Sequence, residues 1–239
     1  MAFKAIVTAG GTAGHINPAI AIARQITSHG GEVLFIGKEG GMETDLVTKE
    51  GFPIRCIKVA GFKRSLSLSN FKTVFLAAKG LAETKKIIKD FAPDIVIGCG
   101  GYVSGPAVFS AAMMKIPTLI HEQNVFPGMT TKILSRVVNR ICVSFEESIK
   151  FLPGKDKAVL TGNPVREGIL TVNSAKARET LGISEPTLLV FGGSLGAKKI
   201  NDSMLDLVKT KKPGEYIVSS GLYVNVYAII TFFPFALPL

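Results

Sequence analysis

Residues 3–18 read F-K-A-I-V-T-A-G-G-T-A-G-H-I-N-P, and this stretch decides the fold. Its first part, Phe3–Ala9, is a short apolar run of the kind that forms a buried strand. A cluster of glycines follows, and Pro18–His29 then carries a helical pattern that Gly30 and Gly31 end. A strand, a glycine turn and a helix in this order predict the first unit of a parallel α/β sheet.

Short apolar runs and longer helical patterns keep alternating beyond this unit. The further predicted strands are Glu32–Gly37, Ile54–Ala60, Asp94–Cys99, Pro117–His121 and Arg140–Ser144. The further predicted helices are Phe71–Phe91, Pro106–Met114 and Thr130–Val138. Because parallel strands need crossover helices between them, the alternation predicts a doubly wound, Rossmann-like sheet covered on both faces.

A second Rossmann-like unit is predicted after the turn Gly162-Asn163-Pro164. Its elements are a strand at Pro186–Phe191, a helix at Ala197–Lys211 and a strand at Glu215–Ser219, after a polar stretch. We therefore expect an N-terminal domain over 1–163 and a second, incomplete domain over 164–239, which is shorter than the roughly 100 residues of a typical domain. Residues 223–239 are uncharged and hold two prolines, which is atypical of such a domain.

The composition favours an anionic partner. The 239 residues carry 28 Lys and Arg against 18 Asp and Glu, a net charge of +10, which suits a nucleic acid, an acidic membrane or a phosphorylated substrate. There is no Trp and there are only four Tyr, so stacking on nucleic-acid bases is poorly supplied and we expect no nucleic-acid partner. The three cysteines stand far apart and predict neither a disulfide framework nor a metal site. The chain turns glycine-rich too early for a signal peptide, and no apolar run predicts a transmembrane helix.

Three predicted strand-to-helix turns are rich in glycine, namely Gly10–His15, Gly98–Gly105 and Gly192–Gly196. They follow the carboxyl ends of their strands, where open α/β sheets bind ligands. Glycine lets the backbone approach a ligand closely, and the N-terminus of the next helix attracts an anion, so the three turns suit phosphate or diphosphate groups. Any one of them could equally serve only as a connection. None has the lysine of a P-loop, and Lys38 rather than an acidic residue follows the second strand, so an NTPase and a nicotinamide enzyme are both disfavoured.

Polar residues at these turns are candidates for chemistry. His15 lies just before the predicted helix, where a neutral imidazole could accept a proton, although it could also belong only to the helix start. The run His121-Glu122-Gln123-Asn124 ends a strand and is either functional or a solvated loop. His29 is expected at the surface, and without a Cys/His cluster metal binding is disfavoured.

Taken in order, five motifs resemble those of one family. They read G-G-T-A-G-H-I-N-P-A, G-C-G-G-Y-V-S-G-P, H-E-Q-N, T-G-N-P-V-R and F-G-G-S-L-G-A, and the family is that of the lipid II-forming peptidoglycan N-acetylglucosaminyltransferases. The resemblance implies a GT-B glycosyltransferase that moves N-acetylglucosamine from UDP-N-acetylglucosamine to lipid I, which is undecaprenyl-diphospho-N-acetylmuramoyl-pentapeptide. It implies inversion and no metal or other cofactor. Two alternatives stay open: a lipid glycosyltransferase with a diacylglycerol acceptor, and an inactive fragment that only binds a membrane or a partner.

The resemblance also assigns roles to residues. His15 matches the histidine near the reacting groups. The implied donor contacts are Thr12, Ala13, Gly14, Asn124, Arg166 and Ser194. The loop implied to face the acceptor diphosphate holds Gly100, Gly101, Tyr102, Ser104 and Gly105. Ala13 stands where many relatives have glycine.

A lipid acceptor implies a peripheral protein at the cytoplasmic face of the bacterial cell membrane. Residues 61–90 hold seven Lys and Arg against two acidic residues, interleaved with Leu, Phe and Val. Such a segment suits an anionic membrane surface, or it is an amphipathic helix whose apolar side is core. The expected partners are thus UDP-N-acetylglucosamine, lipid I and anionic lipid.

Overall fold

The structure is a computed structural model that describes residues 2–59, 69–184, 187–190, 198–210, 216–220 and 228–232. The chain divides into two compact units, Met1–Ile169 and Leu170–Leu239. Residues 164–169 thus fall in the first unit, whereas the sequence placed the domain boundary after residue 163.

The first unit is built on a seven-stranded sheet whose paired strands all run parallel, in the order β3-β2-β1-β4-β5-β6-β7. The strands are β1 (Lys4–Thr8), β2 (Glu32–Lys38), β3 (Ile54–Ile57), β4 (Ile95–Gly98), β5 (Thr118–Glu122), β6 (Arg140–Val143) and β7 (Ala158–Leu160). The first three strands follow one another outward from β1 to one edge of the sheet, and the chain then returns to β4, on the other side of β1, and continues to the opposite edge. This strand order confirms the predicted doubly wound sheet.

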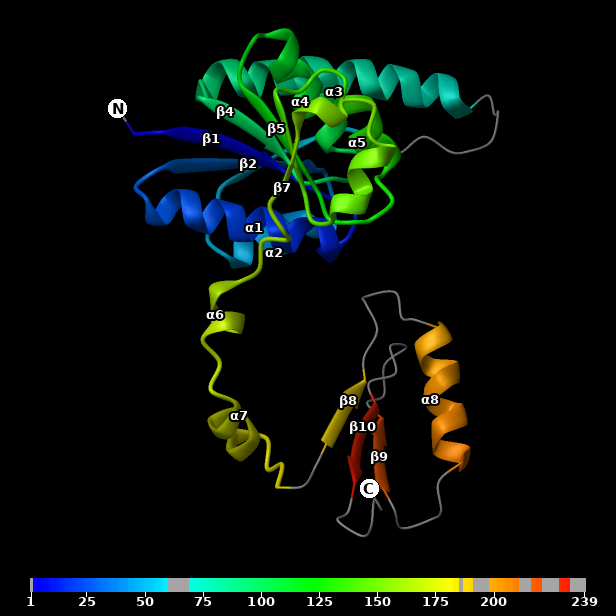
Figure 1. The fold of residues 1–239 in the computed structure, drawn as a ribbon. Coiled ribbons are helices and arrows are strands. Elements are labelled where there is room, and N and C mark those ends of the chain that lie inside the picture. The colour runs from blue at the N-terminus through cyan, green and yellow to red at the C-terminus, as the bar shows by residue number, and fades with distance from the viewer. Residues whose placement is uncertain are drawn as a thin grey trace. The chain divides into compact units, whose positions relative to one another are not determined.

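Helices cover both faces of this sheet (Figure 1). The helices are α1 (Ala13–Ser28), α2 (Met42–Lys49), α3 (Ser69–Phe91), α4 (Ser104–Met113) and α5 (Met129–Leu134), with 3-10 helices η1 (Glu146–Phe151) and η2 (Lys155–Lys157) near the end. One buried cluster joins α1 and α2 to the sheet, and a separate one joins α3, α4 and α5 to it. Neighbouring residues of one strand serve opposite clusters: Ile6 packs with the α3 side and Val7 with the α1 side. This explains why the strands read as continuous apolar runs.

Helix α1 starts earlier than the sequence indicated. It was predicted over Pro18–His29, but it begins at Ala13, after Thr12, whose φ of −145° and ψ of 153° are extended. Pro18 therefore lies inside the helix, where it has no N–H to donate to the carbonyl of Gly14. The consequence for the site is that Ala13, Gly14 and His15 form the first turn of α1.

Helix α2 and strand β7 of the first unit were not predicted, and neither were the 3-10 helices η1 and η2. Helix α2 buries only Glu43 and Val47, so its sequence lacks a clear apolar stripe. Strand β7 is short and lies at the edge of the sheet, with Val159 and Leu160 about half exposed. Helix α2 and strand β7 therefore lack the concentration of apolar residues from which the other strands and helices were predicted.

The second unit contains α7 (Ser174–Thr180), β8 (Thr187–Val190), α8 (Lys198–Thr210), β9 (Tyr216–Ser220) and β10 (Ala228–Phe232), and the short α6 (Glu167–Leu170) spans the division. The predicted polar stretch holds α7, whose first turn is capped by Asn173. Strand β10 lies in the segment that we considered atypical, and it pairs antiparallel with both β8 and β9. The described strands of this unit therefore depart from the purely parallel pairing of the first.

Candidate functional site

The first two glycine turns pack directly against each other. Strands β1 and β4 are neighbours, so the turns after them leave the same edge of the sheet. At Gly101, with φ +80°, an added Cβ would lie 2.3 Å from the carbonyl oxygen of Gly10. At Gly100, with φ +102°, an added Cβ would lie 2.7 Å from Cδ2 of His15. Only glycine permits this approach of two backbones, so the glycine pattern that we noticed in the sequence serves to bring these turns together.

His15 lies at this junction, half-buried in the first turn of α1. Its Nδ1 is 3.1 Å from the carbonyl oxygen of Gly10 and 3.4 Å from Oγ1 of Thr12. Because a carbonyl oxygen only accepts, Nδ1 carries the hydrogen, and in the neutral ring Nε2 keeps its lone pair. The arrangement is therefore suited to a base that accepts a proton at Nε2.

A buried side-chain hydroxyl holds the loop after β4 in place. The buried Ser104 hydroxyl lies 2.7 Å from the carbonyl oxygen of Gly100 and 3.1 Å from that of Thr8, so it stabilises the loop. Tyr102 is more exposed, and Nζ of Lys38 lies 5.8 Å from the centre of its ring. Lys38 ends β2 and brings a cation to the same edge of the sheet, where an anion would be attracted.

Glu43 is a residue of this region that the sequence reasoning missed. It is 2% exposed, and its Oε1 accepts from the N–H of Lys38 at 2.8 Å. Its Oε2 lies 3.4 Å from the N–H of Gly11. The only local sign of this buried carboxylate is the glycines around it, since an added Cβ on Gly10 or Gly41 would lie under 3 Å from its oxygens.

His121 has a structural role in the first unit. Its Nε2 lies 3.0 Å from the carbonyl oxygen of Gly162, and its Nδ1 accepts from the amide nitrogen of Gln123 at 3.0 Å. Burial lowers the pKa of this imidazole, although Gly162 and Glu122 act in the opposite direction. A neutral His121 thus ties the end of β5 to the turn after β7.

Glu122 holds the loop that carries Asn124. Its Oε1 accepts from the backbone and side-chain nitrogens of Asn124 at 3.0 and 2.9 Å, and its Oε2 accepts from the N–H of Gly128 at 3.1 Å. Asn124 is exposed at the carboxyl end of β5, so the loop presents it at the same edge as the glycine turns. Its predicted contact with a donor stays a prediction.

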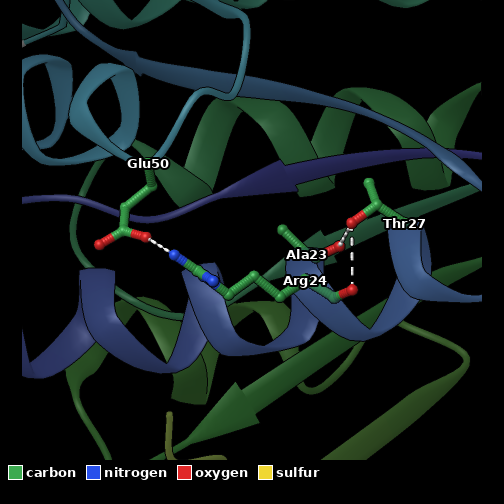
Figure 2. A network of polar contacts seen from close by, with 4 residues as sticks. All are labelled: Ala23, Arg24, Thr27 and Glu50. Carbon is green, nitrogen blue, oxygen red and sulfur yellow. Dashed lines mark hydrogen bonds and ion pairs between the residues drawn. The ribbon is translucent and has the colours of Figure 1, made fainter. Parts of the chain in front are cut away.

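Arg166, a further predicted donor contact, lies away from the two glycine turns. Arg166 lines a cavity of about 680 Å³ with residues of the second half of α1, among them Arg24, Thr27 and Ser28. Figure 2 shows the polar contacts of three lining residues: Arg24 pairs with Glu50, and the Thr27 hydroxyl donates to the carbonyl oxygens of Ala23 and Arg24. Ser194 and the third glycine turn lie outside the described residues. Two of the three predicted turns are thus brought together.

Three further observations complete the description of the site and its surroundings. Within the part of the chain that the structure describes, no three side chains of His, Cys, Asp or Glu gather as a metal site would require. Burial raises the pKa of Cys99 to about 12, so its thiol is protonated at neutral pH. Among the described residues, no helix combines the length and the apolar character that crossing a membrane requires.

Comparison with known sequences gives a consistent family. A family model described as glycosyltransferase family 28 N-terminal domain matches residues 5–143. The UDP-N-acetylglucosamine–N-acetylmuramyl-(pentapeptide) pyrophosphoryl-undecaprenol N-acetylglucosamine transferase of Acetivibrio thermocellus is 51% identical over 221 residues, 90% of this chain and 60% of that protein. The protein of the same name from Clostridioides difficile is 50% identical over 212 residues, 86% of this chain and 52% of that protein. The chain therefore spans little more than half the length of the curated relatives it matches.

Solved structures show the same fold. The crystal structure of MurG from Acinetobacter baumannii is 32% identical, with a TM-score of 0.57 over 74% of this chain and 52% of that one. The UDP-GlcNAc 2-epimerase of Neisseria meningitidis, bound to UDP-GlcNAc, reaches a TM-score of 0.53 at 16% identity, over 76% of this chain and 52% of that one. The second likeness shows the fold alone.

Proposed function

Because the chain belongs to glycosyltransferase family 28, we propose that it transfers N-acetylglucosamine from UDP-N-acetylglucosamine to lipid I, giving lipid II, and that its first unit binds the acceptor. The observation that carries this proposal is the junction of the two glycine turns with His15 between them. Two backbone turns and a helix N-terminus at one edge of the sheet suit the diphosphate groups that donor and acceptor both carry. The names of the relatives supply the two substrates.

The proposed reaction uses His15 as the base. An acceptor hydroxyl oxygen forms a bond to the anomeric carbon while the bond from that carbon to the UDP oxygen breaks, with inversion. The hydroxyl proton goes to Nε2 of His15, directly or through one water, and UDP leaves with the electron pair. General-base assistance of this kind is worth about 10²–10⁴-fold in rate.

The diphosphates would be held by amides and cations in place of a metal. The first N–H groups of α1, at Ala13 and Gly14, have no carbonyl partner within the helix and carry its partial positive charge. Gly100, Gly101 and Gly105 would face the acceptor diphosphate, with Lys38 and Tyr102 at the rim. Asn124 and Ser194 are proposed to contact the donor as well. Arg166 lies beside the second half of α1, at the other end of that helix from the junction, so its implied contact with the donor stays a prediction.

The test is an assay of transfer. We would replace residues 211–239 by the corresponding C-terminal part of the Acetivibrio thermocellus relative and follow labelled N-acetylglucosamine into lipid II. We expect transfer to a lipid I analogue, and a His15→Ala chimera that binds UDP-N-acetylglucosamine but turns over about 10²–10⁴-fold more slowly. Transfer to diacylglycerol instead of lipid I would establish the alternative acceptor. Undiminished turnover by His15→Ala would remove His15 from the role of base.

We also propose that the protein works at the cytoplasmic face of the membrane, because a lipid acceptor has to be reached there. The described surface offers a suitable face on α4 and α5, which pack against each other. Phe109 and Met113 are exposed one turn apart on α4, and Met129 and Ile133 are exposed one turn apart on α5. Lys132 and Arg136 lie beside them in sequence. Exposed apolar pairs next to cations suit an anionic lipid surface.

A further inference from the structure

Glu43 is a buried acidic side chain to which the proposed reaction gives no role. It is the second residue of α2, and its two oxygens accept from two backbone N–H groups, that of Gly11 in the first glycine turn and that of Lys38 at the end of β2. An added Cβ on Gly37 would lie 2.8 Å from its Cγ, and one on Gly10 would lie 2.7 Å from its Oε1. Glycines from three chain segments, at positions 10, 37 and 41, therefore leave the space into which this carboxylate fits.

The peptide group between Gly10 and Gly11 connects Glu43 to His15. Its N–H, on Gly11, lies 3.4 Å from Oε2 of Glu43. Its carbonyl oxygen, on Gly10, lies 3.1 Å from Nδ1 of His15. In a trans peptide these two groups point in opposite directions, so a single amide plane lies between the carboxylate and the imidazole. A charge-assisted bond to the N–H polarises the amide and makes its carbonyl a stronger acceptor.

We propose that Glu43 is a positioning residue that acts on His15 through the Gly10–Gly11 peptide group. The carboxylate holds the amide plane, and the carbonyl of that amide holds the ring hydrogen on Nδ1. The lone pair of the neutral ring is then on Nε2, the nitrogen that takes the proton in the reaction above, and this last step rests on the proposed function. Gly100 lies against Cδ2 and Nε2, so the ring is held from that side as well.

The tautomer of His15 tests the proposal directly on the chain as it stands. Long-range proton–nitrogen NMR of the protein labelled with ¹⁵N-histidine distinguishes the two tautomers at about pH 8, where a free imidazole is neutral. We expect the Nδ1–H form at His15. His121 is an internal reference for the opposite form, since its Nε2 faces a carbonyl oxygen and its Nδ1 faces an amide N–H. A wild-type His15 in the Nε2–H form overturns the proposal without any variant.

Glu43→Gln removes the charge and keeps the size of the side chain. We expect the Nε2–H population of His15 to rise several-fold in this variant, while the His121 signals stay unchanged. Asp45→Asn is the matched control, because it makes the same change at an exposed position of the same helix. Wild-type populations at His15 in Glu43→Gln, with His121 intact, overturn the proposal. If Glu43→Gln does not fold, Glu43→Asp withdraws the carboxylate by one methylene. We expect the Nε2–H population of His15 to rise in this variant too, and wild-type populations would overturn the proposal.

Turnover in the chimera separates this role from a purely structural one. Glu43→Gln should lower kcat on the order of tenfold and leave the KM for UDP-N-acetylglucosamine unchanged. This loss is a fraction of the rate enhancement that a general base supplies. In a His15→Ala background the same change should have no further effect, because the two residues act as a unit. An equal fall in both backgrounds overturns the proposal. A chimera without any transfer would count against the proposed function, and the NMR result would still decide the role of Glu43.

Discussion

Gly101 is the residue on which the junction of the two glycine turns depends most. Its φ is +80°, and an added Cβ would lie 2.3 Å from the carbonyl oxygen of Gly10. We expect Gly101→Ala to lower the free energy of unfolding by about 2–4 kcal/mol, because it adds both backbone strain and overpacking. Urea unfolding measures this.

Gly105→Ala, four residues further on at the start of α4, is the control. An added Cβ there meets only Cγ2 of Thr130, at 3.8 Å, and the residue lies in helix α4, where alanine is favoured over glycine. We expect it to be neutral or slightly stabilising. Equal unfolding midpoints for the two variants would show that the turns do not pack as described.

The lowered pKa of His121 predicts how the stability of the fold depends on pH. Burial lowers its pKa in the folded state, so below about pH 6.5 the unfolded chain binds a proton that the folded one does not. Its contribution to stability is therefore present above that pH and is lost as the pH falls toward the folded pKa, at up to about 1.4 kcal/mol per pH unit. Urea midpoints between pH 5 and 8 measure the slope, which we expect to be shallower in His121→Gln. A His121→Gln slope equal to that of the wild type would contradict this account.

The strands and the longer helices were predictable because each leaves a local pattern. Buried parallel strands appear as apolar runs, and glycines mark the turns after β1 and β4. The predicted start of α1 was wrong by five residues, because a proline usually lies in the first turn of a helix and Pro18 was therefore placed there. Here the helix tolerates it further inside, and Gly14, which has no Cβ, is the residue four positions before it.

The candidate site was predictable only in part, for a related reason. His15 and the glycines could be found because they follow strands, so their place at the carboxyl edge is fixed by topology. Glu43 lies in a polar segment with no pattern, and what makes it important is contact with Gly11, 32 residues away. The order of the strands and the inward turn of the Ser104 hydroxyl likewise depend on contacts distant in sequence, such as that with Thr8.

The proposed association with a membrane concerns the protein as a whole, and two surfaces are candidates for it. The sequence indicated the basic segment 61–90, of whose cations Lys79, Lys85, Lys86 and Lys89 are described and exposed. The structure adds the face of α4 and α5, where Met129 is 73% and Ile133 is 54% exposed. The two surfaces make different predictions, because changes to the side chains of one surface should weaken binding only if that surface meets the membrane.

Vesicle binding distinguishes them, since exposed side chains can be changed with little effect on folding. We expect the chain to bind phosphatidylglycerol vesicles, with binding that weakens as salt rises, because roughly 1 kcal/mol per cation comes from the surface charge. Met129→Ser with Ile133→Ser should weaken binding at least about tenfold, since each partly buried apolar side chain contributes of order 1 kcal/mol. Lys85→Gln with Lys86→Gln is the comparison. If that pair abolishes binding while the serine pair leaves it intact, the segment 61–90 is the membrane surface and the α4–α5 face is not. Equal binding to neutral and anionic vesicles at every salt concentration would contradict both.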